Sequence, residues 1–472
     1  MMYKDLREFI GLVEGLCALR RIAGADPHLE IGAITEVAAG RAGSPALLFD
    51  DIKGFRHGFR IFTNAVTSPQ RAALALGLDP HLRPLDALKA WMDKRKTLEP
   101  RPAHPVKDAA FLQHWMRSEA VDLRQFPAPV WHRHDGGPFI GSGSLVIMRD
   151  PDDGWVNASI YRIQVQDVRR ATVQFDHAGR HGAIIAQKYW ERGKPCPVAV
   201  VHGEDPALFV AGFEYLPARQ SEYEFAGAIK GAPIEVCPGP QTGLPLPAHA
   251  EVVFEGQLLP MSETTLPEGP FGEFTGYYAS EARPAPVMEV TAAYHRSDPI
   301  LLGSPPMKPP RFHFGLPLRA ATIWQNLDAG GVTDVVGAWQ HVSQLMTVVA
   351  LRQRYDGHAK RAALVAAAHS YMARIVVVVD EDIDPSSLDD VMWAVATRCE
   401  PSEQIDILRN AWSSALDPRI PPDEKLVGIT AHSKVIIEAC RPFSWRDKFP
   451  PTSALSQEEA RVVEAKWGEK LK

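Results

Sequence analysis

Residues 268–278 read Glu-Gly-Pro-Phe-Gly-Glu-Phe-Thr-Gly-Tyr-Tyr, so three glycines and a proline lie within eleven positions. Glycine and proline interrupt regular structure, so neither a helix nor a long strand is expected here. Glycine also lets the backbone approach a ligand closely. Two carboxylates, Glu268 and Glu273, flank the tight part, and neighbouring carboxylates in different surroundings can act as one acid and one base. The spacing alone fits a solvated surface turn equally well, because short glycine-rich motifs are weak signals.

The segment around this stretch, residues 138–295, is predicted to consist mainly of strands. It holds short runs of β-branched and aromatic residues separated by turn residues, as at 150–154. The expected strands are 139–148, 155–164, 172–175, 198–202, 251–255 and 287–294. Helices are expected at 181–191 and 207–212, the second leading into a loop that carries Glu222.

The two ends of the chain have a different pattern. The N-terminal part mixes expected helices at 3–20, 68–77 and 85–93 with short strands at 30–36 and 46–49. Near the C-terminus, the apolar run 374–380 predicts a strand in a sheet that is covered on both faces. Together with an expected helix at 389–397 and a strand at 404–408, it indicates a separate α/β domain.

The predicted fold is therefore mixed, with α+β and α/β parts. Its expected parts are an N-terminal α/β part (1–105), a central strand-rich domain (106–316), a linker helix (317–335), a C-terminal α/β domain (336–450) and a terminal helix (451–472).

Composition excludes several classes of protein. The net charge of −6 argues against a nucleic-acid partner. No apolar run approaches the ~18 residues that a membrane span needs, and the N-terminus does not resemble a signal peptide. The five cysteines are dispersed, without a CxxC pair, which favours a reducing cytoplasm over a disulfide or zinc framework. Glycine-rich nucleotide motifs and GxSxG are also missing, so a Rossmann site, a P-loop or an α/β-hydrolase has no support.

Four segments resemble the signature segments of the UbiD family of reversible decarboxylases, and they occur in the order found in that family. They are Glu268-Gly-Pro-Phe-Gly-Glu273 with the following Thr-Gly-Tyr-Tyr, Asn157-Ala-Ser-Ile-Tyr-Arg162-Ile-Gln, Ser221-Glu222-Tyr-Glu-Phe-Ala-Gly227 and Ser433-Lys434-Val-Ile-Ile. The resemblance extends over nearly the whole chain. It implies a split-β-barrel flavin domain in the centre and an oligomer-forming domain at the C-terminus.

The resemblance also implies a cofactor, prenylated FMN, which a flavin prenyltransferase supplies. Its phosphate is expected to bind Mn²⁺ or Mg²⁺, with K⁺ as a possible further ion. The positions that match the metal ligands of the family are Asn157, His181 and Glu222; an amide, an imidazole and a carboxylate suit such ions better than structural zinc. Glu224 is a rival for the carboxylate position. His132 and His134 are interpreted as loop residues near the site.

The remaining cofactor contacts follow from the same resemblance. Lys434 is expected at the cofactor phosphate, a role that suits its compact charge. On sequence alone, a surface lysine is an equally good interpretation. The expected cofactor-binding residues are Asn157, Ser159, Ile160, Tyr161, Arg162, Gln174, Phe175, Arg180, His181, Glu222 and Lys434.

The implied catalytic residues are Arg162, Glu268 and Glu273. Arg162 is expected to bind the substrate carboxylate, Glu268 to hold Arg162, and Glu273 to deliver the proton that replaces CO₂. The segment 307–316 is expected in the pocket wall, where it would contribute the polar side chains of Lys308, Arg311 and His313. We therefore expect the substrate to be a hydroxylated, heterocyclic or dicarboxylated aromatic acid. Glu438 is a further candidate for tuning that pocket.

The predicted function is non-oxidative decarboxylation of an aromatic, heteroaromatic or α,β-unsaturated acid, with the acid and CO₂ as small-molecule partners. The alternatives are a flavoprotein that binds ordinary FMN and a non-catalytic subunit of a larger carboxylase complex. A paired-carboxylate glycosidase is a more distant alternative, because it does not explain Asn157, His181 and Glu222. A homodimer or a higher homo-oligomer is expected.

Overall fold

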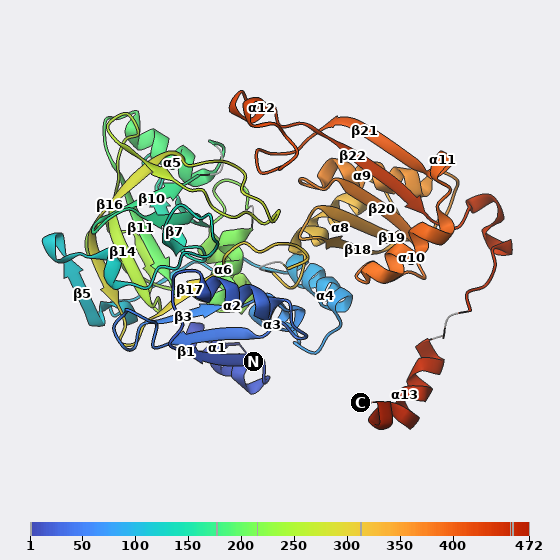
Figure 1. The fold of residues 1–472 in the computed structure, drawn as a ribbon, viewed down its shortest axis with the longest axis horizontal. Helices are drawn as coiled ribbons and strands as arrows, with labels where there is room; N and C mark the ends of the chain where they lie inside the picture. Colours follow the sequence, from blue (N-terminus) through green and yellow to red (C-terminus); the bar gives the residue numbers. More distant parts are fainter. Residues whose placement is uncertain are drawn as a thin grey trace.

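The structure is a computed structural model, and it describes residues 2–175, 178–214, 216–311, 314–453, 455 and 457–471. Three parts follow one another along the chain (Figure 1). They are a small N-terminal α/β part, a large curled sheet that forms a half-barrel, and a C-terminal α/β domain beside it. The predicted mixed fold is thus confirmed.

The N-terminal part is built on a four-stranded sheet in the order β1-β2-β3-β17. Its last strand, β17, comes from the far end of the central segment and pairs in parallel with β3. The elements are α1 (Leu6–Gly15), β1 (Leu19–Ala23), α2 (Glu30–Ala39), β2 (Ala46–Asp50), β3 (Arg60–Thr63), α3 (Pro69–Ala75), α4 (Pro84–Lys96) and β17 (Ile300–Gly303).

Two predictions for this part need correction. The first helix ends at Gly15, and residues 19–20 already belong to β1. Residues 30–36 form helix α2 rather than a strand: the buried residues are Ile31, Gly32, Thr35 and Ala38. Their spacing of three to four positions is the helical one, but Gly32 and Thr35 weaken the apolar periodicity that would indicate it.

The central sheet has ten strands, of which eight follow the order β6-β9-β10-β16-β14-β11-β7-β8, while β5 and β15 pair with β16. Each of the predicted strands 139–148 and 155–164 is divided in two. The strands are β5 (His114–Arg117), β6 (Phe139–Gly141), β7 (Leu145–Arg149), β8 (Val156–Ile160), β9 (Arg162–Val165), β10 (Arg170–Gln174), β11 (Cys196–His202), β14 (Val252–Leu258), β15 (Thr265–Glu268) and β16 (Arg283–His295).

Three helices accompany this sheet: α5 (His181–Trp190), α6 (Pro206–Phe213) and α7 (Glu222–Lys230). Glu222 is the first residue of α7, so the predicted loop at this position is wrong. The hydroxyl of Ser221 caps this helix by accepting from the backbone N–H of Glu224. A small separate sheet contains β4 (His104–Pro105), β12 (Glu235–Pro238) and β13 (Pro245–Pro247).

The C-terminal domain contains a five-stranded sheet in the order β18-β19-β20-β22-β21. Its central strand β20 is buried along nearly its whole length, as its continuous valine run predicts. The elements are α8 (Leu318–Ala329), β18 (Val335–His341), β19 (Met346–Leu351), α9 (His358–His369), β20 (Ile375–Asp380), α10 (Leu388–Arg398), α11 (Pro401–Gln404), β21 (Ile405–Ala411), α12 (Pro422–Leu426), β22 (His432–Ala439) and α13 (Gln457–Leu471).

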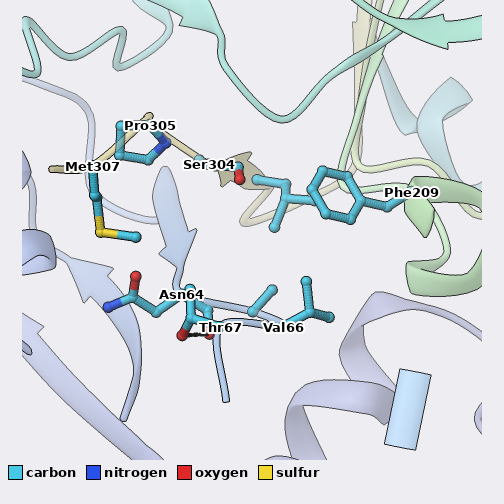
Figure 2. A pocket seen from close by; sticks show the side chains of 10 residues that line it. Asn64, Val66, Thr67, Phe209, Ser304, Pro305 and Met307 are labelled. Carbon is cyan, nitrogen blue, oxygen red and sulfur yellow. Dashed lines mark hydrogen bonds between the residues drawn. The ribbon is translucent and has the colours of Figure 1, made fainter. Parts of the chain in front are cut away.

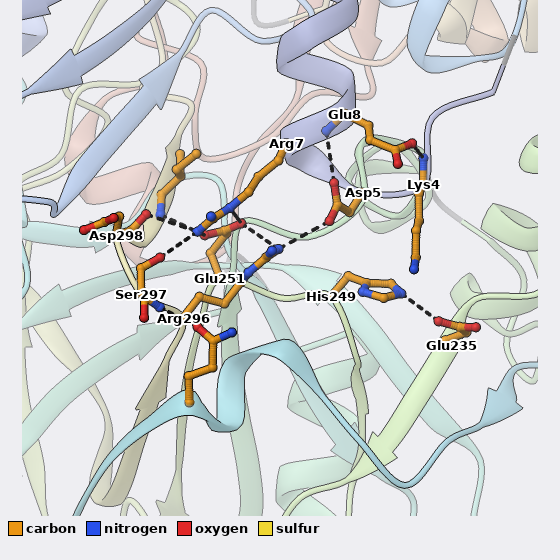
Figure 3. Close-up of polar contacts among 12 residues, drawn as sticks. Lys4, Asp5, Arg7, Glu8, Glu235, His249, Glu251, Arg296, Ser297 and Asp298 are labelled. Carbon is orange, nitrogen blue, oxygen red and sulfur yellow. Dashed lines mark hydrogen bonds and ion pairs between the residues drawn. The ribbon is translucent and has the colours of Figure 1, made fainter.

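A cluster of ion pairs ties helix α1 to the central sheet (Figure 3). Glu251, whose side chain is fully buried, accepts from Nε and Nη2 of Arg7 at 2.7 Å each and from Arg296 at 3.1 Å. Asp5 lies 3.3 Å from Arg296. We call these four residues the Glu251 cluster. Among the residues that the structure describes, no helix is long and apolar enough to cross a membrane.

Candidate active site

Arg162 connects the two carboxylates of the glycine-rich stretch. Its Nε and Nη2 donate to Glu268 at 2.6 and 2.9 Å, and its Nη1 donates to Glu273 at 2.5 Å. The Glu268 side chain is buried, whereas those of Glu273 and Arg162 keep 12% and 16% of their surface exposed. The predicted trio of Arg162, Glu268 and Glu273 is therefore assembled in space, with Glu273 and Arg162 on the accessible side.

The backbone of the stretch is irregular, as predicted from its glycines. Strand β15 ends at Glu268, and Gly269 and Gly276 follow with φ of 84° and 83°. The backbone N–H of Gly276 donates to the carbonyl of Glu273, and the N–H of Glu273 to that of Tyr277. Glu273 thus lies in a tight turn, and left-handed glycines permit the chain reversals around it.

Two buried side chains outside the stretch hold it in place. Gln164 accepts from the backbone N–H of Gly269 at 2.8 Å, and Asp135 accepts from that of Gly272 at 3.1 Å. The backbone N–H of Gly136 donates to the carbonyl of Pro270, and a Cβ at Gly136 would lie 1.8 Å from the carbonyl oxygen of Gly269. The approach of the two segments therefore requires glycine at position 136.

Asn157, on strand β8, is in contact with Glu222 at the start of helix α7. The amide nitrogen of Asn157 donates to Glu222 at 2.7 Å and to Ser159 at 2.9 Å. The second oxygen of Glu222 accepts from the backbone N–H of Ala158. Burial raises the pKa of Glu222 to about 7 despite these hydrogen bonds. The backbone N–H of Glu224 donates to the Ser221 hydroxyl, while Glu222 is the carboxylate that contacts Asn157.

The amide oxygen of Asn157 is fully buried and has no hydrogen-bond partner among the described residues. Buried polar atoms are nearly always satisfied, so such an oxygen calls for a ligand. No group of three or more His, Cys, Asp and Glu side chains in the described ranges is arranged to hold a metal ion. Of the three predicted ligands, His181 and Glu222 belong to these residue types, and the third is the amide oxygen of Asn157.

His181 is the first residue of helix α5, and it is linked to this group through Trp155. Its ring packs against Trp155 at 5.0 Å between centroids, and the indole N–H of Trp155 donates to the carbonyl of Gln220. Trp155 therefore lies between His181 and the segment that leads into Glu222. Burial, followed by the charges of Arg180 and Arg219, lowers the pKa of His181, which favours the neutral imidazole that binds metal ions.

The other predicted cofactor residues lie on strands β8 and β10 and in the segments next to β8, β10 and α5. Gln174 pairs with Arg162 across β9 and β10, and Phe175 packs edge-on against Tyr161 at 5.0 Å. The guanidinium of Arg180 lies over the Tyr161 ring and donates to the carbonyl of Ile160 at 3.3 Å. The N-terminus of a ten-residue helix, α5, begins here and provides a positive partial charge that suits a phosphate.

Lys434 does not lie with this group. It is buried in the C-terminal domain, where its Nζ donates to the carbonyls of Ala367 at 2.9 Å and Ser370 at 2.7 Å. Burial lowers its pKa to about 8. In this conformation the lysine caps the end of α9, so the contact with cofactor phosphate stays a prediction.

The polar residues expected in the pocket wall are distributed over different places. The Lys308 stem lies against Gly276, whereas the guanidinium of Arg311 points toward the end of α2. Glu438 forms an ion pair with Lys360 at 2.7 Å in the C-terminal domain. His313 lies outside the described residues.

Sequence reasoning did not identify the supporting residues Asp135 and Gln164. Their signal was available, since Asp135-Gly-Gly follows the histidine-rich loop and Gln164 ends the Asn157 segment. A third such residue, Ser343, comes from the C-terminal domain. Its hydroxyl lies 3.4 Å from the carbonyl of Phe274 and 3.3 Å from that of Arg311, a contact that no sequence motif announces.

Comparison with known proteins accounts for this arrangement. Three family descriptions match: the N-terminal, the Rift-related and the C-terminal domains of 3-octaprenyl-4-hydroxybenzoate carboxy-lyase, over residues 12–91, 104–309 and 312–439. The structure is similar to that of the UbiD-class enzyme HmfF from Pelotomaculum thermopropionicum in complex with FMN. The TM-score is 0.86 and the identity 28%, over 98% of this chain and 100% of HmfF.

Two further relatives match the chain over its full length. Vanillic acid decarboxylase of Sedimentibacter hydroxybenzoicus, in open form with truncated ShVdcD, has 29% identity and a TM-score of 0.84, with 99% of that chain covered. The apo 3,4-dihydroxybenzoic acid decarboxylase of Enterobacter cloacae has 25% identity and a TM-score of 0.87, with 100% covered. The family descriptions and these structures together identify the chain as a member of the UbiD family, and therefore as a carboxy-lyase.

Proposed function

We propose that this protein catalyses the reversible, non-oxidative decarboxylation of an aromatic, heteroaromatic or α,β-unsaturated carboxylic acid, with prenylated FMN as its cofactor. The observation that carries the proposal is the guanidinium of Arg162 held between the carboxylates of Glu268 and Glu273. The cofactor is supported by HmfF, which is described with FMN and, in an evolved dimeric form, with prFMN.

Each residue of the trio has a distinct task in this proposal. Arg162 binds the substrate carboxylate, since a guanidinium presents two parallel N–H donors to it. Glu268 is buried and holds two donors of Arg162, which fixes the plane of the guanidinium. Glu273 is the more accessible carboxylate and delivers the proton to the carbon that loses CO₂. Prenylated FMN, when bound, supplies the electron sink for that carbon.

Charge supports the proton-donor role of Glu273. With both carboxylates ionised, the trio carries one positive and two negative charges. A substrate carboxylate adds a third negative charge beside Arg162, and this favours the form in which Glu273 holds a proton. The partial exposure of Glu273 leaves a path by which that proton can be replaced.

The test of the function is direct. The purified chain, supplied with prenylated FMN, should release CO₂ from at least one member of a panel of hydroxylated, heterocyclic and dicarboxylated aromatic acids. A non-catalytic subunit would release none, and a flavoprotein that uses ordinary FMN would retain unmodified FMN by absorbance and mass. If no acid of the panel releases CO₂, or if the protein retains unmodified FMN, the corresponding alternative would take the place of the proposal.

Asn157, His181 and Glu222 would hold a divalent metal, Mn²⁺ or Mg²⁺, for the cofactor phosphate. The buried, unpartnered amide oxygen of Asn157 is the observation that supports this assignment. The metal would neutralise phosphate charge in a site where Glu222 is itself buried.

We expect Glu222→Ala to lose both metal and flavin, measured by elemental analysis and flavin absorbance of the purified protein. Glu224→Ala, two positions along the same helix, is the matched control and should retain both. The opposite pattern would transfer the ligand role to Glu224.

The proposal also includes assembly into a homodimer or a higher homo-oligomer through the C-terminal domain. Exposed apolar side chains on α10, including Met392 and Trp393, support this role. Light scattering at micromolar concentration should give at least twice the chain mass of 52.0 kDa, and a monomer there would contradict this part of the proposal.

A further inference from the structure

A cavity of about 380 Å³ lies between the N-terminal part and the C-terminal domain. Its walls are the end of α2, residues 310–311 and 314–317 of the connecting segment, and the end of β18 with the turn after it. This volume is in the range of small-molecule sites, ~300–1,000 Å³. A second cavity, between Phe209, Ser304 and Thr67, offers only about 10 Å³ and holds at most a water molecule (Figure 2).

Arg311 supplies the positive charge of the larger cavity. Its Nη1 lies 3.4 Å from Glu36, a long contact, and its Nε has no partner among the described residues. A guanidinium has five N–H donors, so most of its hydrogen-bonding capacity is unused. About a third of the side chain is exposed, and the cavity is the space beside it.

Arg71 adds a second positive charge behind the wall. It is fully buried, and the acceptors around it are uncharged oxygens, including the Ser44 carbonyl and the Thr67 hydroxyl, which both line the cavity. No carboxylate in the described ranges forms an ion pair with Arg71. Among the described residues, these two guanidinium groups thus share one carboxylate, that of Glu36, which pairs with Arg311 at 3.4 Å. Arg71 has no counterion there, and a buried charge without a counterion favours binding of an anion nearby.

The uncharged walls restrict the shape of that anion. Phe314 and Trp339 line the cavity and are themselves largely buried, so they offer apolar surfaces next to Arg311. His341 donates its Nε2 proton to the carbonyl of Pro385, and burial lowers its pKa, so it stays neutral near pH 7. Arg311 is the cationic side chain that lines the cavity itself, and together with these aromatic side chains it matches a planar acid with a single carboxylate.

We propose that this cavity is a second ligand site, separate from the Arg162 trio, which binds a small aromatic carboxylate through Arg311. The site is close to the trio: Ser343, which lines the cavity, lies 3.4 Å from the carbonyl of Phe274, the residue after Glu273. Its occupancy therefore affects a wall that also supports the proton-donor segment. The proposal does not depend on the reaction that the trio catalyses.

The test uses benzoate as the probe and isothermal titration calorimetry of the full chain. The parent protein carries Arg162→Gln, so that a carboxylate bound by the trio does not contribute. This parent should bind one benzoate per chain, and benzamide, which has the same shape without the charge, should bind at least tenfold more weakly. A parent that does not bind benzoate at millimolar concentration would overturn the proposal.

The variant that decides the location is Arg311→Gln in the same background, which should weaken benzoate binding at least tenfold. The matched control is Arg41→Gln, which removes an exposed arginine next to Gly40 and should leave the affinity unchanged within twofold. If Arg311→Gln does not fold by circular dichroism, Arg311→Lys keeps the charge without the planar fork and should weaken binding several-fold. Equal affinity in an Arg311 variant and in the parent would overturn the proposal.

Discussion

The Glu251 cluster and the Arg162 trio are both made of arginine and carboxylate side chains, but they differ in the balance of positive and negative charges. In the Glu251 cluster, two arginines face two carboxylates, and the buried Glu251 also accepts from the backbone N–H of Ile300 at 3.2 Å. In the trio, one arginine faces two carboxylates. Exposure does not separate the two groups, because Arg7 of the cluster keeps 33% of its side-chain surface and Arg162 of the trio keeps 16%. The first arrangement is complete, whereas the second can still accept a charged ligand or a proton.

The Glu251 cluster and the Arg162 trio also differ in the secondary structure that positions their carboxylates. Glu251 lies directly before strand β14, and its partners come from helix α1 and the end of β16, so regular elements fix the geometry (Figure 3). Glu273 lies in a turn between glycines, which leaves its carboxylate near the surface. The comparison teaches that an arginine–carboxylate contact indicates chemistry where its charges are unbalanced and a turn, rather than regular structure, positions one of the carboxylates.

The largest expected effect comes from Glu273→Gln. The amide keeps the shape and the hydrogen-bonding capacity but has no transferable proton, so turnover should fall roughly 10²- to 10⁴-fold. Cofactor content and thermal stability should stay near those of the parent, and exchange of the product hydrogen for deuterium should fall with turnover. Glu281→Gln, an exposed change in the same segment, is the control. Full turnover in Glu273→Gln would remove this residue from the mechanism.

The next effect in size is a loss of stability from Glu251→Gln. Two arginines, of which Arg296 is the more buried, would then face Asp5 alone, at a cost of about 3 kcal/mol in the free energy of unfolding. Turnover per folded molecule should be unchanged. Glu235→Gln, which removes the half-exposed contact with His249, should cost less than about 1 kcal/mol (Figure 3). Denaturant unfolding measures both, and equal losses would contradict the stabilising role assigned to the Glu251 cluster.

The smallest of the three effects is expected for Glu268→Gln. It removes the charge that holds two donors of Arg162, while Glu273 keeps the third. Binding of the substrate carboxylate should weaken along with turnover, giving roughly a tenfold loss in kcat/KM that includes a higher KM. A change in kcat alone would assign Glu268 a part in the chemistry rather than in orientation.

Prediction from sequence succeeded where a local pattern determines the structure. The valine run of β20, the helix α5 after Gly179 and the glycine-rich turn all follow from short-range propensity, and the structure has each of them. The helix at 30–39 was mistaken for a strand because its buried face contains Gly32 and Thr35, which weaken the apolar periodicity.

The candidate site required information beyond local patterns. Asn157 and Arg162 lie on two strands separated by Tyr161, so the alternation of a single strand does not relate their directions. The contacts of Gln164 and Asp135 with the glycine-rich stretch depend on sheet pairing and loop packing between distant segments. Lys434 belongs to a matching segment, yet it bonds carbonyls at the end of α9, because tertiary packing determines the partners of a buried ammonium group.

The pairing of β17 with β3 has a consequence for synthesis of the chain on the ribosome. Strand β3 is Arg60–Thr63, and the strand that completes its sheet is Ile300–Gly303. At translation rates of ~5–20 residues per second, β3 waits roughly 10–50 s for its partner. During that time one edge of the nascent N-terminal sheet is open to pairing with another chain. A chaperone that covers residues 46–63 would therefore increase the yield of native protein.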